Sequence, residues 1–264
     1  MEIISVINQK GGVGKTTTVI NLAAGLSKLK KKILVIDLDP QGNATTGLGL
    51  SNVDNSSDTI YGVLNGSKEI TQVIKKTQFD NLDIITSNVD LSGLEVETAD
   101  DSNRAFILKA KLASYLNNSR GSYDYVLIDC PPSLSLLTVM ALVSSSSLLV
   151  PLQTEFFALE GLTQLMKTID RIKDNLNPDL EIRGILLTMY DKRNKLSSQV
   201  EKEARDYFTE KVYSTVIPRN VRLSEAPSHG MPVLIYDKSC PGSKSYYNFT
   251  NEFLNQESKI GSAA

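Results

Sequence analysis

The chain has 264 residues, of which 41% are hydrophobic and 22% charged, and its formal net charge is −2. A globular chain of this length can bury a core without a disulfide or a structural metal. The slight negative charge excludes a polycationic nucleic-acid binder, so any DNA binding would have to come from a local patch. The two cysteines, Cys130 and Cys240, lie in no CxxC or Cys/His motif, which argues against a zinc site.

The N-terminal segment enters an apolar run almost at once, without the charged region, apolar core and cleavage site of a signal peptide. The longest apolar runs, such as 148–152, are far too short to span a bilayer. Two isolated thiols fit a reducing compartment. We therefore expect a cytoplasmic protein.

Short apolar runs alternate with helical patterns along the chain. The runs that predict strands are 3–7, 33–36, 82–86, 125–128, 147–152, 182–189 and 213–217. The helical patterns are 16–29, 104–117, 134–143, 158–173, 197–208 and 243–254. Continuous apolar strands separated by helices predict an α/β fold, a doubly wound and mostly parallel sheet flanked by helices. We expect one domain over 1–255, a mobile loop at 42–60 and a disordered tail at 256–264.

The segment from Gln9 to Thr17 lies between the first predicted strand and the first predicted helix. Its glycines let backbone N–H groups turn toward phosphate oxygens, and the helix N-terminus adds its dipole. Lys15 is placed to reach the β- and γ-phosphates, and the Thr16 hydroxyl is placed to ligate Mg²⁺. The sequence predicts an ATP and Mg²⁺ site formed by Lys10, Gly11, Gly12, Val13, Gly14, Lys15, Thr16 and Thr17.

Acidic residues follow two of the predicted strands. Asp37 and Asp39 come after 33–36 in the run IDLDPQGN, and Asp129 ends the run YVLID. The carboxyl ends of parallel strands face the crevice where ligands bind. An apolar strand ending in aspartate is typical of a magnesium site, so Asp129 is a predicted ligand. Ordinary turns at Asp39 and Asp129 remain alternatives.

These segments resemble the deviant Walker A family of P-loop ATPases, which includes the partition ATPases ParA and Soj and the division-site protein MinD. The loop QKGGVGKTT has Gln9 where an ordinary P-loop has glycine, and it carries the additional Lys10. The run DLDPQGN and the run IPRNVRLSEAPSHG at 217–230 favour the ParA/Soj branch. The resemblance covers nearly the whole chain, from Glu2 to about Leu254.

The resemblance implies roles for individual residues in catalysis. Lys10 would reach the partner's phosphates in an ATP-dependent homodimer, where it would act with Lys15 of that site. Asp39 would orient or activate the attacking water, and Asp37 would support the Mg²⁺ environment. The enzyme would be an ATPase with weak intrinsic turnover.

The resemblance also implies contacts in the second half of the chain. Pro218 and Asn220 would contact the adenine, although an ordinary turn after a strand is an alternative. Arg193 and Arg222 would bind DNA without sequence preference. Residues 183–222 contain nine Lys or Arg and five Asp or Glu, a net charge of +4 that suits DNA phosphates. A solvated charged face is the alternative for this excess.

Taken together, the resemblance implies a DNA-segregation ATPase. Its ATP-bound dimer would bind DNA non-specifically, and a ParB/Spo0J-type centromere-binding partner would stimulate hydrolysis in a cytoplasmic, nucleoid-associated protein. A MinD-like membrane ATPase is disfavoured because residues 246–257 lack the basic face of a membrane-binding helix. The cysteines do not form the paired set of an iron–sulfur carrier. An ATPase that positions protein clusters stays open, since its nucleotide site would look the same.

Overall fold

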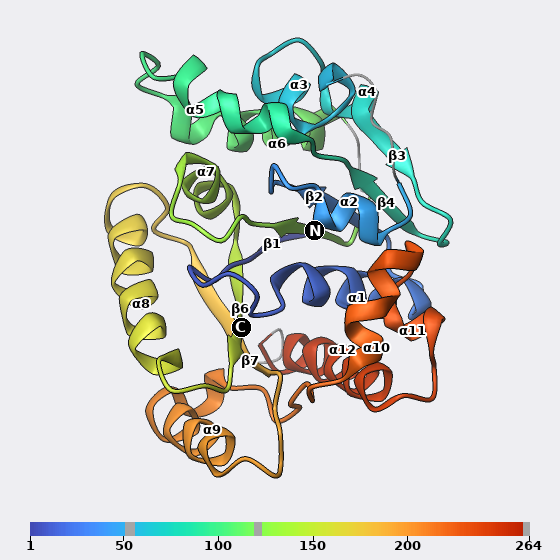
Figure 1. The fold of residues 1–264 in the computed structure, drawn as a ribbon. Coiled ribbons are helices and arrows are strands. Elements are labelled where there is room, and N and C mark those ends of the chain that lie inside the picture. The colour runs from blue at the N-terminus through green and yellow to red at the C-terminus, as the bar shows by residue number, and fades with distance from the viewer. Residues whose placement is uncertain (51–55, 119–122, 261–264) are drawn as a thin grey trace.

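The computed structural model describes residues 1–50, 56–118 and 123–260 and contains one seven-stranded sheet in the order β3-β4-β2-β5-β1-β6-β7 (Figure 1). The strands are β1 (Glu2–Val6), β2 (Ile33–Asp37), β3 (Ile74–Lys76), β4 (Leu82–Ile85), β5 (Tyr125–Asp129), β6 (Ser147–Gln153) and β7 (Glu181–Thr188). All pair in parallel except β3, which runs antiparallel to β4 at the edge. The predicted doubly wound, mostly parallel fold is confirmed.

Helices follow most strands. The α-helices are α1 (Lys15–Lys28), α2 (Asn43–Gly47), α3 (Ile60–Leu64), α4 (Ile70–Val73), α5 (Leu94–Glu97), α6 (Ile107–Asn118), α7 (Leu136–Ser144), α8 (Ala158–Asn175), α9 (Lys195–Phe208), α10 (Val221–Glu225), α11 (Val233–Tyr236) and α12 (Pro241–Ile260). Within the described ranges, no helix combines the length and apolar character that crossing a membrane requires.

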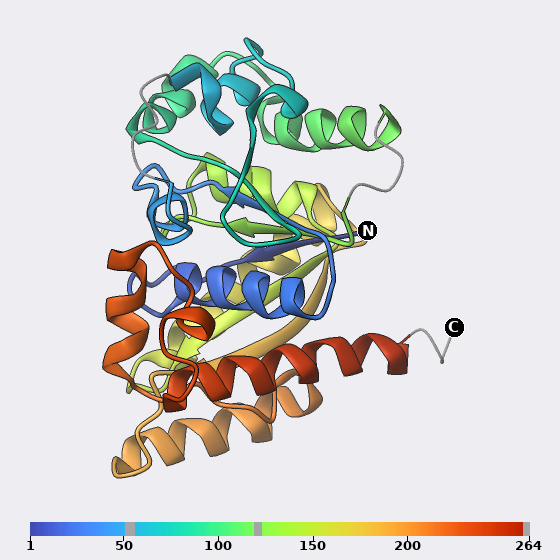
Figure 2. The ribbon, with the colours of Figure 1, turned by 90° about the vertical axis from the view of Figure 1, so that its right-hand side faces the viewer.

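Two apolar cores lie on opposite faces of the sheet, because successive strand side chains point to opposite sides. In β2, Leu34 and Ile36 join the core beneath the helices α3 to α9, while Ile33 and Val35 join the core beneath α1, α2, α11 and α12. Figure 2 shows α12 running beside α1, and the Thr18 and Tyr246 hydroxyls of these helices are 3.1 Å apart. Burial on both faces explains why the strands read as continuous apolar runs.

The strand predicted at 213–217 is wrong. This segment runs beside β7, and only the residues that flank it, Val212 and Pro218, form isolated bridges, with Ile185 and Tyr190. The Tyr213 amide donates to Ile185 O at 3.0 Å, and the Ile217 amide donates to Leu187 O at 2.8 Å. These bonds extend the edge of the sheet without forming a regular ladder. The apolar run at 213–217 therefore predicted a strand where the chain is irregular.

The loop predicted at 42–60 contains the helix α2 and the 3₁₀ turn Ser56–Asp58, whereas 51–55 lie outside the described residues. Buried Ala44 and Thr45 hold α2 against the core, which polar composition alone did not reveal. At the other end of the chain, α12 continues through Ile260, so it overlaps the predicted tail at 256–260. Residues 261–264 lie outside the described part of the chain.

Candidate functional site

The segment between β1 and α1 forms a tight loop at the carboxyl end of the central strands. Gly12 has φ +77° and Gly14 has φ +92°, both in the left-handed region that side chains disfavour. Gly14 also caps α1, so the free amides of its first turn open on the loop. Lys15 is buried, and its ammonium donates to Lys10 O at 3.0 Å. Burial lowers the pKa of Lys15, and the charge of Asp129 opposes this shift.

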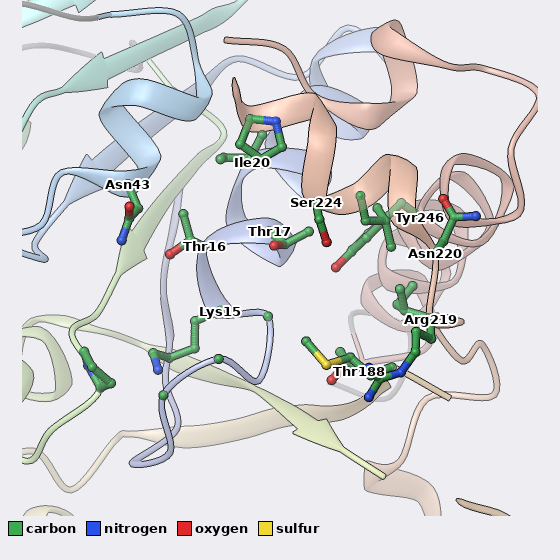
Figure 3. A pocket seen from close by; sticks show the side chains of 18 of the residues that line it. Lys15, Thr16, Thr17, Ile20, Asn43, Thr188, Arg219, Asn220, Ser224 and Tyr246 are labelled. Carbon is green, nitrogen blue, oxygen red and sulfur yellow. The ribbon is translucent and has the colours of Figure 1, made fainter. Parts of the chain in front are cut away.

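A cavity of about 600 Å³ opens on this loop (Figure 3). Its volume lies within the range of small-molecule and cofactor pockets. One wall is the loop and the start of α1, and the opposite wall comes from the segment after β7 and from α10 and α12. The predicted residues that line it are Gly11, Gly12, Gly14, Lys15, Thr16, Thr17, Asp39, Pro218 and Asn220.

Asp129 ends β5 beside the loop. Its side chain is fully buried, and neither carboxyl oxygen accepts a hydrogen bond from a described residue. Burial raises the pKa of Asp129 well above its ordinary range and the charge of Asp37 raises it further, whereas the Thr16 hydroxyl and the charge of Lys15 oppose the shift. An ionised carboxylate in this position needs a compensating cation. The orphaned oxygens therefore fit a magnesium role for Asp129.

Asp37 is the register partner of Asp129 on the neighbouring strand β2. Its Oδ2 accepts hydrogen bonds from the amide and the hydroxyl of Thr45, both at 2.7 Å. Burial raises the pKa of Asp37 to about 6, although the hydrogen bonds from Thr45 oppose the shift. Asp37 thus fixes α2 at the rim of the cavity. Its charge would also favour a cation held by Asp129 on the neighbouring strand.

Asp39 is buried and lines the cavity. Its Oδ1 accepts from the Gln41 amide at 3.0 Å, which fixes the carboxylate at the start of the turn into α2. The described residues contain no cluster of three or more His, Cys, Asp or Glu suited to a metal. A magnesium ion here would take most of its ligands from phosphates and water, as this ion commonly does.

The far end of the cavity is formed by the segment after β7. Asn220 leaves its Oδ1 buried without a hydrogen-bond partner among the described residues, and Pro218 lines the same wall. Met189 and Arg219 complete this end, and Figure 3 shows Arg219 and Asn220 on the side opposite Thr16. An apolar wall with an unpaired amide oxygen suits a planar base that carries an amino donor.

Besides Asp37 and Asp129, four further predicted residues do not line the cavity. Lys10 has a side chain 51% exposed and forms an ion pair with Glu155. Val13 is buried, and its carbonyl accepts from the Thr188 hydroxyl at 2.8 Å. The side chains of Arg193 and Arg222 are exposed and do not line the cavity.

Sequence patterns did not identify several residues that line the cavity. They include Ile20, Gln41, Asn43, Thr46, Pro132, Thr188, Met189, Leu223, Ser224, Pro227 and Tyr246. Gln41 and Asn43 belong to the run DLDPQGN, and Arg219 lies between Pro218 and Asn220, so their position in a motif was an available signal. Thr188 and Tyr246 carry no such signal, because folding alone brings β7 and α12 to the loop.

Comparisons with known proteins agree with this geometry. Residues 1–182 match a family model described as an AAA domain. The chain is 51% identical over 257 residues to the chromosome partitioning protein ParA of Caulobacter vibrioides, covering 97% of this chain and 95% of the relative. It is 48% identical over 251 residues to the sporulation initiation inhibitor protein Soj of Bacillus subtilis, covering 95% and 97%. The chain belongs to the ParA/Soj family of chromosome-partitioning ATPases.

A solved structure with a bound nucleotide has a similar fold. The cobyrinic acid a,c-diamide synthase of Mycobacterium smegmatis, with a bound ATP analogue and magnesium, superposes with a TM-score of 0.83 at 32% identity. The match covers 98% of this chain and 96% of that protein. The fold of this ParA/Soj member is therefore one that accommodates a nucleotide with magnesium.

Proposed function

We propose that this chain is a switch in which ATP drives two copies to close face to face, and that the dimer segregates DNA. The observation that carries the proposal is the position of Lys10. Its side chain leaves the phosphate loop, is 51% exposed and does not line the cavity of its own subunit. A loop cation turned away from its own phosphate site is available to the phosphates of a second subunit.

The residues of the cavity have separate tasks in this proposal. The loop amides and Lys15 hold the β- and γ-phosphates, and Pro218 and Asn220 receive the adenine. Thr16 and Asp129 hold Mg²⁺, which when bound neutralises the charge that develops on the phosphates. The Asp39 carboxylate, fixed by the Gln41 amide, orients the attacking water.

The DNA-binding surface is proposed at Arg193 and Arg222. Residues 183–222 carry a net charge of +4 within a chain of net charge −2, which supports this location. A dimer doubles the number of phosphate contacts, so that DNA affinity follows the nucleotide state. A ParB/Spo0J-type partner would stimulate hydrolysis and release monomers from the nucleoid.

DNA binding measured across a salt series tests the proposal. With ATP we expect retention that falls steeply as salt rises, because each phosphate contact releases counterions. With ADP or without nucleotide we expect weak binding at every salt concentration. Equal binding in all three nucleotide states would refute the switch.

A further inference from the structure

The exposed lysine of the phosphate loop has a partner within its own chain. The ammonium of Lys10 forms an ion pair with Oε1 of Glu155, and that oxygen is buried. Glu155 lies in the turn between β6 and α8, and its side chain is 30% exposed. The pair joins the loops that follow two neighbouring strands, β1 and β6.

The backbone around this pair is fixed on both sides. The Lys10 amide donates to Asn8 Oδ1 at 3.0 Å, and Asn8 Nδ2 donates to Pro151 O at 2.8 Å. On the other side, the Ala158 amide donates to Glu155 O at 3.0 Å and so begins α8. The carboxylate of Glu155 therefore stands at a defined place beside the loop.

We propose that Glu155 restrains Lys10 in the monomer and so opposes dimerisation. The inference rests on the proposed function, in which Lys10 serves the phosphates of a second subunit. The Lys10 ammonium has to leave Glu155 before it can cross the interface, and both subunits of a symmetric dimer break one such pair. Glu155 is a positioning residue in this account, since it acts only through Lys10.

A hydrogen bond within the loop links this restraint to the nucleotide. Lys15 donates to the carbonyl of Lys10 at 3.0 Å, so the two loop lysines are directly connected. A triphosphate that draws the Lys15 ammonium toward its oxygens removes this bond from Lys10. Occupation of the cavity thus removes the bond to the Lys10 carbonyl, and Glu155 remains the restraint on the Lys10 ammonium.

The test compares Glu155→Gln with wild type and with the matched control Glu160→Gln. Glu160 is exposed in the first turn of α8, so its substitution removes the same charge nearby. Sedimentation velocity with a non-hydrolysable ATP analogue gives the dimer dissociation constant of each protein. For Glu155→Gln we expect that constant to fall about tenfold, because two partly exposed ion pairs no longer have to break. For Glu160→Gln we expect a value within about twofold of wild type.

A second measurement examines the nucleotide-free monomer. Lys10 should react several-fold faster with an amine-acylating reagent in Glu155→Gln than in wild type, as read by peptide mass spectrometry, and Glu160→Gln should match wild type. Unchanged Lys10 reactivity, or faster reaction with unchanged or weaker dimerisation, overturns the restraint. If no protein dimerises with the analogue, the proposed switch itself fails, and the inference fails with it. If all three proteins dimerise equally, the restraint by Glu155 is rejected, but the proposed ATP-driven switch is not.

Discussion

The phosphate loop and the basic segment at 183–222 present their charges in opposite ways. Around the loop, Lys15 and Asp39 are buried and line one cavity, and Asp129 is fully buried at the end of β5. On the basic segment, Arg193 is paired with Asp191 at 2.9 Å and Arg222 with Glu225 at 2.7 Å, all of them near solvent. The first set is buried, whereas Arg193 and Arg222 are each already paired with a neighbouring carboxylate.

This contrast separates nucleotide binding, for which a single chain already has buried charged groups, from DNA binding. Preorganised buried groups act strongly on an arriving charge, since they need no rearrangement and little water screens them. Exposed arginines paired with carboxylates contribute weakly and respond to salt. The nucleotide site is therefore largely preorganised in a single chain, whereas under the proposed function DNA binding would depend on the number of arginines that a dimer brings together.

The largest expected effect follows from removing the buried cation of the loop. For Lys15→Ala we expect ATP affinity to fall about 100-fold or more, because the phosphates lose a partly desolvated charged partner. Titration with a fluorescent ATP analogue measures the effect, with the exposed Lys32→Ala as control. Affinity near that of wild type would contradict the assignment of the loop.

The next effect separates binding from turnover. For Asp39→Ala we expect ATP to bind and hydrolysis to fall about 100-fold or more, because the water loses its orienting carboxylate. Dimers should accumulate on size exclusion with ATP. Normal hydrolysis by a monomeric Asp39→Ala protein would exclude this role and weaken the contrast between the two regions.

The smallest effect concerns the exposed region. For Arg222→Glu we expect DNA affinity to fall about tenfold at moderate salt, with a shallower salt dependence, because a phosphate contact becomes a repulsion. ATP-dependent dimerisation should stay as in wild type, which light scattering would check. DNA retention equal to wild type would place the DNA surface elsewhere.

Sequence patterns predicted the regular core better than its edges. The strands β1, β2, β4, β5, β6 and β7 lie within two residues of their predicted bounds, because burial on both faces leaves an unbroken apolar run. The predictions missed β3, whose three residues are only partly buried or exposed, and they mistook the irregular segment at 213–217 for a strand. Whether a short edge segment forms a strand depends on the strands beside it, and its few residues carry little periodic signal of their own.

The sequence by itself determined the phosphate loop, since the glycines, Lys15 and Thr16 are adjacent in the chain and a strand and a helix flank them. It also predicted a magnesium role for Asp129 from the end of one apolar strand. The packing of the fold was needed to show that Tyr246 and Thr188 line the same cavity as the loop, and that Lys10 forms an ion pair with Glu155. These contacts join segments more than a hundred residues apart, and such distances close only when the sheet packs its strands side by side.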